Sequence, residues 1–492
     1  MNNTRKEHIL FLTGKLAEKR LQRVLESMQP AEFTYEVRNI GVSVAALMTA
    51  QMLVRRLSAL EGVNRIMVPG LCRGDLAEVD ARIGLPVGRG PEDLKDIPAF
   101  FGRAGKAPDL SRHNVQILAE ITDAPLITVP QILKRAARYA ADGADVIDIG
   151  CLPETPFPHL EEAVAALHDA GCRVSVDALE DDDLLRGGRA GADYLLSLKK
   201  STLWIADEVP SIPVLIPEPH TDMPSLYETI AEFSTKDRPF IVDSILDPVH
   251  FGFTDSLMRY HALRREYPEV EIMMGIGNLT ELTEADTTGI NAVLFGIISE
   301  LQITNVLTTE VSPHARSAVR EADRARRIMY AAREEGSLPK GIDDSLLTTH
   351  ARKPFPYTAE EIGEMAAEVR DPSYRIMVSE QGIHVYNRDG ILVVENPFDL
   401  FPQLDLLQDD APHAFYMGVE LAKARIAWQL GKRYRQDEEL EWGAAVAPAD
   451  DQNKDDLSHS AHALKGKATG ISEYQDAGST LQAARKKRKK KI

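Results

Sequence analysis

Between residues 113 and 335, short apolar runs alternate with amphipathic segments of helical period. Continuous β-branched runs separated by helices are typical of parallel strands that are buried on both faces. Eight such runs over roughly 220 residues fit a (β/α)8 barrel. The alternative, a doubly wound open sheet, usually has fewer parallel strands. The expected strands are Val115–Ile121, Ala144–Ile149, Arg173–Val176, Tyr194–Leu198, Val214–Ile216, Phe240–Leu246, Glu271–Ile276 and Asn305–Glu310.

The chain before this barrel has the pattern of a small open α/β unit. Strands are expected at residues 8–13, Tyr35–Asn39 and Val63–Val68. Helices are expected to end near Met28 and to span Val42–Leu60.

Glycines follow two of these strands. Gly14 and Lys15 come after the first strand, but the Gly-x-x-x-x-Gly-Lys-Ser/Thr pattern of a phosphate-cradling loop is absent, so we interpret Gly14 as a turn. Gly70 and Gly74 come after the third strand, where they either end it or line a pocket.

A second small unit follows the barrel. Tyr374–Val378, Gly382–Tyr386 and Ile391–Val394 predict a three-stranded meander. A long helix is expected from about Phe415, and His413 just before it is interpreted as a helix-entry contact rather than a ligand.

The expected fold class is therefore α/β: a central (β/α)8 TIM barrel with a small N-terminal α/β domain and a C-terminal α+β domain. The last residues are poor in apolar side chains and include seven consecutive bases, which is typical of a disordered, solvated tail. The expected division is 1–110 for the N-terminal domain, 111–335 for the barrel, 336–372 for a connector, 373–445 for the C-terminal domain and 446–492 for the tail.

Composition narrows the class of protein. A net charge of −18 argues against a general nucleic-acid binder. The three cysteines, Cys72, Cys151 and Cys172, lack the spacing of a zinc site or a disulfide framework, which indicates a reducing compartment. No apolar run reaches the roughly 20 residues of a membrane helix, and none near the N-terminus is long enough for a secretory signal. We expect a cytoplasmic protein that binds neither nucleic acid nor membrane.

Polar side chains follow every predicted barrel strand, at the end where such barrels carry their chemistry. Most are carboxylates or amides, which suit a substrate with many N–H donors or a divalent cation that neutralises a phosphate leaving group. For any single residue, capping of a loop is the alternative. The set is Glu120 with Asp123, Asp148, Asp177, Ser197 with Lys199, Glu218 with His220, Asp243 with Asp247, Asn278, and Glu310 with Ser312.

Two of these segments resemble dihydropteroate synthase and the other pterin-binding barrels. GADVIDIG at 143–150 resembles the second strand of that family. SVDA at 175–178 resembles its third-strand motif, whose pterin-binding Asp falls on Asp177.

Two further motifs extend the resemblance. LDPVHFGF at 246–253 is similar to the sixth-strand Asp-Pro-x-x-Gly-Phe motif, whose pterin-binding Asp falls on Asp247; Phe251 lies in the same motif. ILAEITDAP at 117–125 is similar to a variant of the first-strand Asn-Val-Thr-Pro-Asp motif, with Glu120 in place of Asn.

The chain also departs from the synthases. Gly275-Ile-Gly-Asn-Leu-Thr replaces the Ser-Arg-Lys segment after strand seven and is closer to pterin-dependent methyltransferases. Leu307, Thr308 and Thr309 replace the Arg-x-His of strand eight. Cys151-Leu-Pro-Glu-Thr-Pro replaces the Ser-Thr-Arg-Pro loop that holds p-aminobenzoate. The pterin half of the pocket is thus retained and the p-aminobenzoate half rebuilt.

The three-part layout is similar to the dihydropteroate synthase-related proteins of methanogenic archaea and methylotrophic bacteria, and the C-terminal unit resembles a domain related to one component of the tetrahydromethanopterin methyltransferase. This resemblance implies a transferase in tetrahydromethanopterin biosynthesis. It would join 6-hydroxymethyl-dihydropterin diphosphate to ribofuranosylaminobenzene 5′-phosphate, releasing diphosphate with help from Mg²⁺.

The resemblance also assigns roles to residues. Glu120 and Asp123 are expected near Mg²⁺, and Lys199, with Lys200 and Arg316 as further candidates, is expected to neutralise phosphate charge. Asp177, Asp247 and Lys199 are the expected catalytic residues. The expected substrate-binding residues are Asp148, Asp177, Ser197, Asp247, Phe251, Asn278, Glu310 and Ser312.

Two alternatives remain open. The barrel could bind a methylated pterin, with Asn278 near its N5, and pass the methyl group to a corrinoid protein. It could also be a non-catalytic pterin-binding or assembly subunit. Barrels of this family often dimerise, so the resemblance implies a homodimer, although no segment locates an interface.

Overall fold

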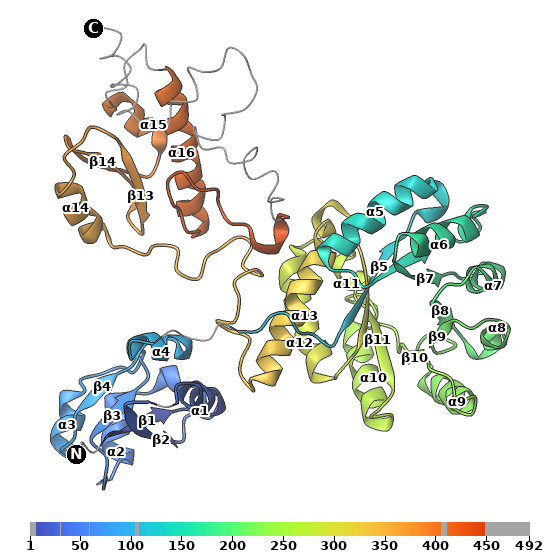
Figure 1. Cartoon of the computed structure of the whole chain (residues 1–492), viewed down its shortest axis with the longest axis horizontal. Coiled ribbons are helices and arrows are strands. Elements are labelled where there is room, and N and C mark those ends of the chain that lie inside the picture. The colour runs from blue at the N-terminus through green and yellow to red at the C-terminus, as the bar shows by residue number, and fades with distance from the viewer. Residues whose placement is uncertain (1–5, 30, 59, 104–107, 405–410, 448–492) are drawn as a thin grey trace. The chain divides into compact units, whose positions relative to one another are not determined.

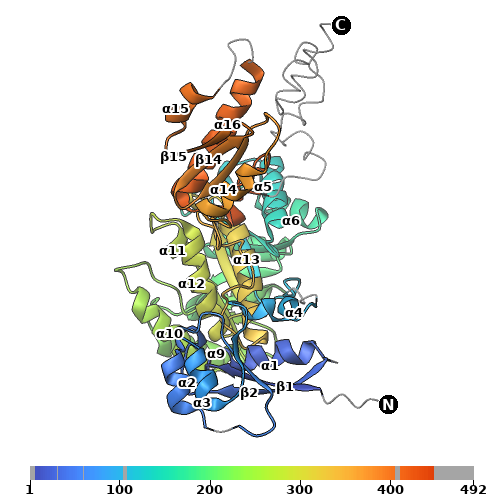
Figure 2. The same ribbon diagram turned by 90° about the vertical axis from the view of Figure 1, so that its left-hand side faces the viewer.

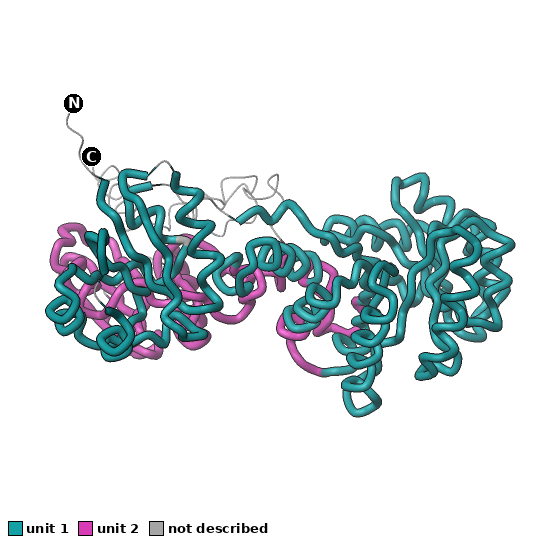
Figure 3. Tube along the Cα trace, turned by 90° about the horizontal axis from the view of Figure 1, so that it is seen from below, with its two compact units in different colours: residues 1–283, 291–309, 322–343 teal, residues 284–290, 310–321, 344–492 magenta. Residues whose placement is uncertain are grey.

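The computed structural model describes residues 6–29, 31–58, 60–103, 108–404 and 411–447. The predicted basic tail therefore lies outside the described residues, apart from its first two. The chain forms two compact units, shown in Figure 3. The first contains residues 1–283, 291–309 and 322–343, and the second contains 284–290, 310–321 and 344–492, so the chain passes between the units five times.

The N-terminal part forms a four-stranded, all-parallel sheet with the strand order β2-β1-β3-β4. Helices α2 and α3 cover one face and α1 covers the other, as Figure 1 shows. The fourth strand is not among the three strands expected for this part of the chain. The elements are β1 Glu7–Thr13, α1 Glu18–Ser27, β2 Phe33–Asn39, α2 Ala50–Arg56, β3 Arg65–Val68, α3 Ala77–Ile83, β4 Val87–Arg89 and α4 Ile97–Phe100.

The helix predicted at Val42–Leu60 is shorter than expected. Only a 3₁₀ turn at Ala45–Leu47 and α2 form. The carbonyl of Val42 accepts a hydrogen bond from the backbone N–H of Lys15 at 2.8 Å, and that of Ser43 accepts one from Leu16 at 3.1 Å. Because these carbonyls bind another loop, they are not available for a helix.

The central part is a closed barrel of eight parallel strands, which confirms the predicted fold class. Each strand forms within the predicted run or one or two residues from it. The strands are β5 Gln116–Ile121, β6 Val146–Gly150, β7 Arg173–Asp177, β8 Tyr194–Leu198, β9 Ile212–Leu215, β10 Ile241–Val242, β11 Glu271–Gly275 and β12 Asn305–Thr309.

Helices connect the barrel strands and form its outer layer (Figure 1). They are amphipathic, with buried apolar positions on one side. The helices are α5 Val129–Asp142, α6 Leu160–Asp169, α7 Asp181–Arg189, α8 Ile205–Glu208, α9 Met223–Ser234, α10 Phe253–Glu266, α11 Gly277–Thr280, α12 Thr287–Glu300 and α13 Ala318–Glu334.

The barrel interior is filled by one apolar residue from most strands, including Leu118, Val146, Leu196, Ile241 and Met273. Since side chains alternate along a strand, the residue two positions further on also points inward. This rule takes Leu118 to Glu120, Val146 to Asp148 and Ile241 to Asp243. The next layer of the interior is therefore acidic.

The sixth barrel strand, predicted at Phe240–Leu246, contains only Ile241 and Val242. Asp243 Oδ1 accepts a hydrogen bond from the backbone N–H of Ile245 at 2.7 Å. Ile245 has a φ of 64°, which lies outside the strand region. The chain therefore turns immediately after Asp243, although its sequence remains apolar.

One buried arginine on α13 joins the segments where the barrel begins. Arg326 donates hydrogen bonds to the carbonyls of Val115 (2.6 Å) and Gly143 (2.9 Å). It also pairs with Asp323 and Asp145 and is only 2% exposed. A buried charge with this many partners is costly to disrupt, because its removal takes one donor from each of two carboxylates and two carbonyls.

We therefore expect Arg326→Met to lower the free energy of unfolding by about 3–5 kcal/mol, measured by chemical denaturation. Arg324→Met is the matched control: Arg324 lies on the same helix without an ion pair among the described residues, and it should change stability by less than about 0.5 kcal/mol. Equal effects of the two substitutions would contradict this role.

The C-terminal part contains the predicted antiparallel meander, with α16 packed against it (Figure 2). His413 on α16 is buried, with its ring 6.2 Å from that of Tyr374 and 6.1 Å from that of Tyr416. The elements are α14 Ala359–Ala367, β13 Arg375–Ser379, β14 Gly382–Asn387, β15 Gly390–Val394, α15 Pro397–Leu400 and α16 Ala411–Leu430. Within the described ranges, no helix combines the length and apolarity that crossing a membrane requires.

Candidate functional site

Three carboxylates from neighbouring strands meet inside the C-terminal end of the barrel. Carboxyl oxygens of Glu120, Asp148 and Asp177 lie within 4.8 Å of one another. The register places Glu120 of β5 beside Asp148 of β6, and Gly150 of β6 beside Asp177 of β7. We call these three residues the acid cluster.

Asp148 is the most deeply buried member of the acid cluster, with no exposed surface. Its Oδ1 accepts a short hydrogen bond of 2.5 Å from the hydroxyl of Ser175. Its Oδ2 receives no hydrogen bond from the residues that the structure describes. Burial, together with the charges of Glu120 and Asp177, holds the pKa of Asp148 well above its usual range.

Glu120 shares this environment. Burial is the main cause, and the charges of Asp177 and Glu281 add to it, so that the pKa of Glu120 rises to about 8. Burial likewise raises the pKa of Asp177, although the hydroxyl of Ser197, which donates to its Oδ1 at 2.9 Å, partly opposes this. At neutral pH the acid cluster therefore holds protons or requires a cation.

Two neighbouring positions shape the surroundings of Glu120. A Cβ at Gly150 would lie 2.6 Å from Glu120 Oε1, so a side chain at this position would displace the carboxylate from the end of β6. Thr309, beside Glu120 in the β12–β5 register, donates to Glu281 Oε1 at 3.1 Å. Glu281 thus extends the acidic surface toward β12.

Asp243 completes the acidic interior from the end of β10. Its Oδ1 accepts hydrogen bonds from the hydroxyl of Tyr260 (2.5 Å) and from the N–H of Ile245. Burial raises its pKa to about 6, and the charge of Asp177 contributes to the same shift. The charges of Asp177 and Asp243 are therefore coupled.

Asp247, four residues later, is held differently. Arg259 of α10 donates to its Oδ2 at 2.7 Å, and His220 Nε2 lies 3.7 Å from its Oδ1. Arg259 also donates to the carbonyls of Ser244 and Ile245. The guanidinium thereby fixes the loop that carries the Asp-Pro motif.

The remaining predicted residues at or after the ends of β8, β10 and β11 are more exposed. Ser197 has a φ of 69° and bonds Asp177. The ammonium of Lys199 has no ion pair among the described residues, although its charge lowers the pKa of nearby Glu218, after the larger effect of a hydrogen bond from Ser201. Asn278 donates to the carbonyl of Leu246 at 2.6 Å, and Phe251 is 81% exposed.

The structure does not group Asp123 with the acid cluster. Asp123 forms an ion pair with Arg135 of α5. Of the two residues predicted near Mg²⁺, only Glu120 lies among the close carboxylates. Lys200, a further candidate for binding phosphate, pairs with Glu228 at 2.5 Å.

Glu310, Ser312 and Arg316 belong to the second compact unit. Glu310 Oε1 accepts a hydrogen bond from the N–H of Val319, and Ser312 precedes the 3₁₀ turn Pro313–Ala315. Arg316 lines a polar cavity of about 210 Å³ within that unit, which also includes His314, Thr348 and Trp442.

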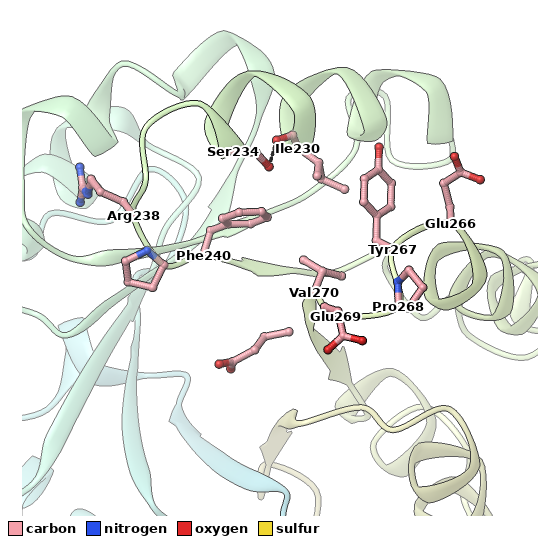
Figure 4. A pocket seen from close by; sticks show the side chains of 11 residues that line it. Ile230, Ser234, Arg238, Phe240, Glu266, Tyr267, Pro268, Glu269 and Val270 are labelled. Atoms are coloured by element: carbon pink, nitrogen blue, oxygen red, sulfur yellow. Dashed lines mark hydrogen bonds between the residues drawn. The ribbon is translucent and has the colours of Figure 1, made fainter.

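Another cavity, of about 460 Å³, lies at the opposite end of the barrel strands (Figure 4). Phe240 and Glu271, at the start of β10 and β11, belong to its lining. Arg238 in its wall donates to the carbonyls of Val209 and Ser211. Because barrel enzymes place their chemistry at the other end, we do not include this cavity in the candidate site.

Sequence reasoning missed Ser175, Arg259, Tyr260 and Glu281. The sequence could have indicated Ser175, because it lies two positions before Asp177 and therefore on the same face of a strand. Arg259 and Tyr260 lie on a helix, and Glu281 follows one, so nothing in their local pattern indicates that they contact the barrel mouth.

Comparisons with known proteins assign no activity to the chain. Residues 7–92 match a family of unknown function, DUF6513. A curated relative, the uncharacterized protein MJ0107 of Methanocaldococcus jannaschii, is 24% identical over 523 residues, covering 88% of this chain and 98% of the relative.

The chain is also similar to solved dihydropteroate synthases. One from Yersinia pestis, with a pterine-sulfa conjugate, is 17% identical with a TM-score of 0.35, covering 46% of this chain and 96% of that one. One from Xanthomonas albilineans, with indole-2-carboxylic acid and 6-chloroguanine, is 19% identical with a TM-score of 0.36, covering 46% and 94%. Likeness at this level carries no conclusion about chemistry.

The raised pKa of Glu120 predicts a pH-dependent stability. Its proton is bound more tightly in the folded than in the unfolded state, so the stabilisation is complete below about pH 4.5 and is lost as the pH rises through about 8. Glu120→Gln should therefore gain roughly 1–3 kcal/mol over the wild type between pH 5 and pH 8.5, measured by denaturation at both pH values.

The control is Glu162→Gln, which changes an exposed carboxylate on α6. Its stability should follow that of the wild type at both pH values. If Glu120→Gln did the same, the acid cluster would not have the electrostatic coupling described above.

Proposed function

We propose that the protein is a pterin-binding transferase of the dihydropteroate synthase type, which joins 6-hydroxymethyl-dihydropterin diphosphate to an arylamine and releases diphosphate. The observation that carries this proposal is the buried acidic interior at the C-terminal end of the barrel. Carboxylates are acceptor-only groups, and a pterin presents a 2-amino group and ring N–H groups along one edge.

Asp177 and Asp243 are the best-placed acceptors for that edge. In each carboxylate the hydrogen bonds fall on Oδ1, from Ser197 in one case and from Tyr260 and Ile245 in the other. None of the described residues donates to either Oδ2. Two charged hydrogen bonds from a pterin, each contributing about 1.5–3 kcal/mol, would satisfy these oxygens and fix the ring.

Asp247 remains a substrate-binding candidate through the family motif. Its carboxylate already accepts from Arg259, which stabilises the loop that carries Phe251. We therefore propose that Asp247 helps to position this loop beside the bound ring. The substitutions below separate its contribution from that of Asp243.

The donor set also fits Mg²⁺, which prefers carboxylate oxygens. Glu120 and Asp148 would hold the ion, since their oxygens lie close together and Asp148 Oδ2 has no other partner among the described residues. When bound, the ion supplies positive charge to the leaving diphosphate.

In the proposed reaction the bond between the exocyclic methylene and the diphosphate oxygen breaks, and a bond forms between that carbon and the arylamine nitrogen. The electron pair of the broken bond leaves with diphosphate. The new secondary ammonium then loses its proton to water or to a carboxylate of the site. Asp177 and Asp243 hold the ring throughout, so the methylene faces the barrel mouth.

For the arylamine we favour ribofuranosylaminobenzene 5′-phosphate, as part of tetrahydromethanopterin biosynthesis. The support is the loop after β6, where Cys151-Leu-Pro-Glu-Thr-Pro stands in place of the sequence that holds p-aminobenzoate in the synthases. A larger acceptor requires a different loop at this position.

A second candidate function is pterin binding without turnover. Its support is that three basic side chains near the strand ends are already paired: Arg135 with Asp123, Lys200 with Glu228 and Arg259 with Asp247. Neutralisation of the charge on a leaving diphosphate would then rely on Lys199 and Mg²⁺, which disfavours turnover.

The test is incubation of the full chain with Mg²⁺, 6-hydroxymethyl-dihydropterin diphosphate and the ribosylated arylamine phosphate, with p-aminobenzoate in a parallel reaction, followed by mass spectrometry. We expect the joined product with the ribosylated acceptor and not with p-aminobenzoate. Pterin binding by calorimetry without product from either acceptor would instead establish the second candidate.

We expect Asp177→Asn and Asp243→Asn each to reduce kcat/KM by roughly tenfold to 150-fold, because each removes a charged hydrogen bond to the pterin. Asp247→Asn should have a smaller effect. Asp255→Asn, an exposed change on α10, is the matched control and should leave the rate unchanged. Less than a tenfold loss for both Asp177→Asn and Asp243→Asn would contradict the site.

A further inference from the structure

The N-terminal sheet has a topological switch point between β1 and β3. The chain leaves β1 over the face of α1 toward β2, and leaves β3 over the opposite face, through α3, toward β4. In open α/β sheets, ligands bind outside the carboxyl ends of the strands at the point where the connections diverge in this way. The carboxyl edge of this sheet is therefore a candidate site that does not involve the barrel.

Loops from all four strands meet at this edge, and glycines allow them to do so. A Cβ at Gly14 would lie 2.8 Å from the backbone nitrogen of Ala45, and one at Gly70 would lie 2.6 Å from that of Glu92. Arg73 exchanges backbone hydrogen bonds with the segment at Met48 and Ala50. The loops after β1, β2 and β3 are thus joined into one surface.

Three polar side chains at this edge, Thr13, Lys15 and Arg73, form no side-chain hydrogen bond or ion pair with the described residues. Thr13, the last residue of β1, is 2% exposed, yet its hydroxyl forms no hydrogen bond with them. The hydroxyl oxygen of Thr13 is not fully buried, so it is open to a ligand at this edge of the sheet. Lys15 and Arg73 are exposed and form no ion pair with the described residues, in a protein with a net charge of −18.

The same loops expose apolar side chains. In the described part of residues 6–103, the large apolar residues that are more than a third exposed are Leu16, Val44, Leu47, Leu71 and Phe100. All but Phe100 lie in the loops that follow β1, β2 and β3. An apolar rim with two unpaired cations is complementary to a ligand with an apolar body and an anionic group.

We propose that the carboxyl edge of the N-terminal sheet, between β1 and β3, binds a small molecule made of a planar aromatic ring and a phosphate group. Lys15 and Arg73 contact the phosphate, the hydroxyl of Thr13 donates to it, and Leu16, Leu47 and Leu71 cover the ring. Phosphate binding here does not require a helix N-terminus, because Lys15 in the loop between β1 and α1 supplies the positive charge.

The experiment is calorimetric titration of the full chain with flavin mononucleotide and with adenosine monophosphate, each paired with its dephosphorylated form, riboflavin or adenosine. We expect one of the two phosphates to bind at a single site with a Kd of roughly 10–100 µM, and its dephosphorylated form to bind at least tenfold more weakly. Thr13→Val and the double change Lys15→Ala with Arg73→Ala should each weaken binding at least fivefold.

Lys19→Ala, an exposed change on α1, is the matched control and should leave the affinity unchanged. Asp177→Asn should also leave it unchanged, which separates this site from the barrel. Thermal unfolding confirms that each variant is folded. The proposal would be overturned if neither phosphate bound at 1 mM (roughly the weakest affinity worth measuring). It would also be overturned if the dephosphorylated form bound equally well, or if Thr13→Val left the affinity unchanged.

A protein partner at this edge is the competing outcome. If the wild type self-associates in light scattering, and Leu47→Ser abolishes this while the phosphates fail to bind, the apolar rim is an interface between copies of the chain. That result would also overturn the small-molecule proposal.

Discussion

Closure of eight parallel strands leaves no solvent inside the barrel, so every second side chain of each strand must occupy its interior. Apolar residues fill the middle layer, and the next inward position on three strands is Glu120, Asp148 or Asp243. Each loses most of its hydration there, which raises its pKa. The protein thus holds several carboxylates at one end of a packed core, where a donor-rich or cationic ligand can satisfy them.

Much of this arrangement could be predicted from the sequence, because continuous apolar runs and strand-ending acids are local signals. Barrel strands from β5 to β12 followed that pattern, and Glu120, Asp148 and Asp177 came together as residues at strand ends do. The length of β10 could not be predicted, since the left-handed conformation of Ile245 depends on a hydrogen bond to Asp243. The absence of a helix directly after Val42 could not be predicted either, because the carbonyl of Val42 accepts a hydrogen bond from Lys15 in another loop.

The Asp-Pro motif shows what a local sequence pattern leaves open. Asp243 and Asp247 both follow the sixth barrel strand, and the family motif favours Asp247. In three dimensions, Asp247 forms an ion pair with Arg259, a residue of the following helix, while the charge of Asp177 helps to raise the pKa of Asp243. A pattern along one strand contains no information about a cation that approaches from another element, so the partner of each acid had to come from the structure.

The way the chain alternates between its two compact units bears on how the protein could have arisen and how it can be divided. Segments 284–290 and 310–321 interrupt the last part of the barrel in sequence yet cluster with the C-terminal unit. Simple end-to-end fusion of two finished genes would not interleave them in this manner. Deleting everything after residue 343 would keep all eight barrel strands but strip these two segments of the rest of their unit, so the barrel is unsuited to excision as a self-sufficient module.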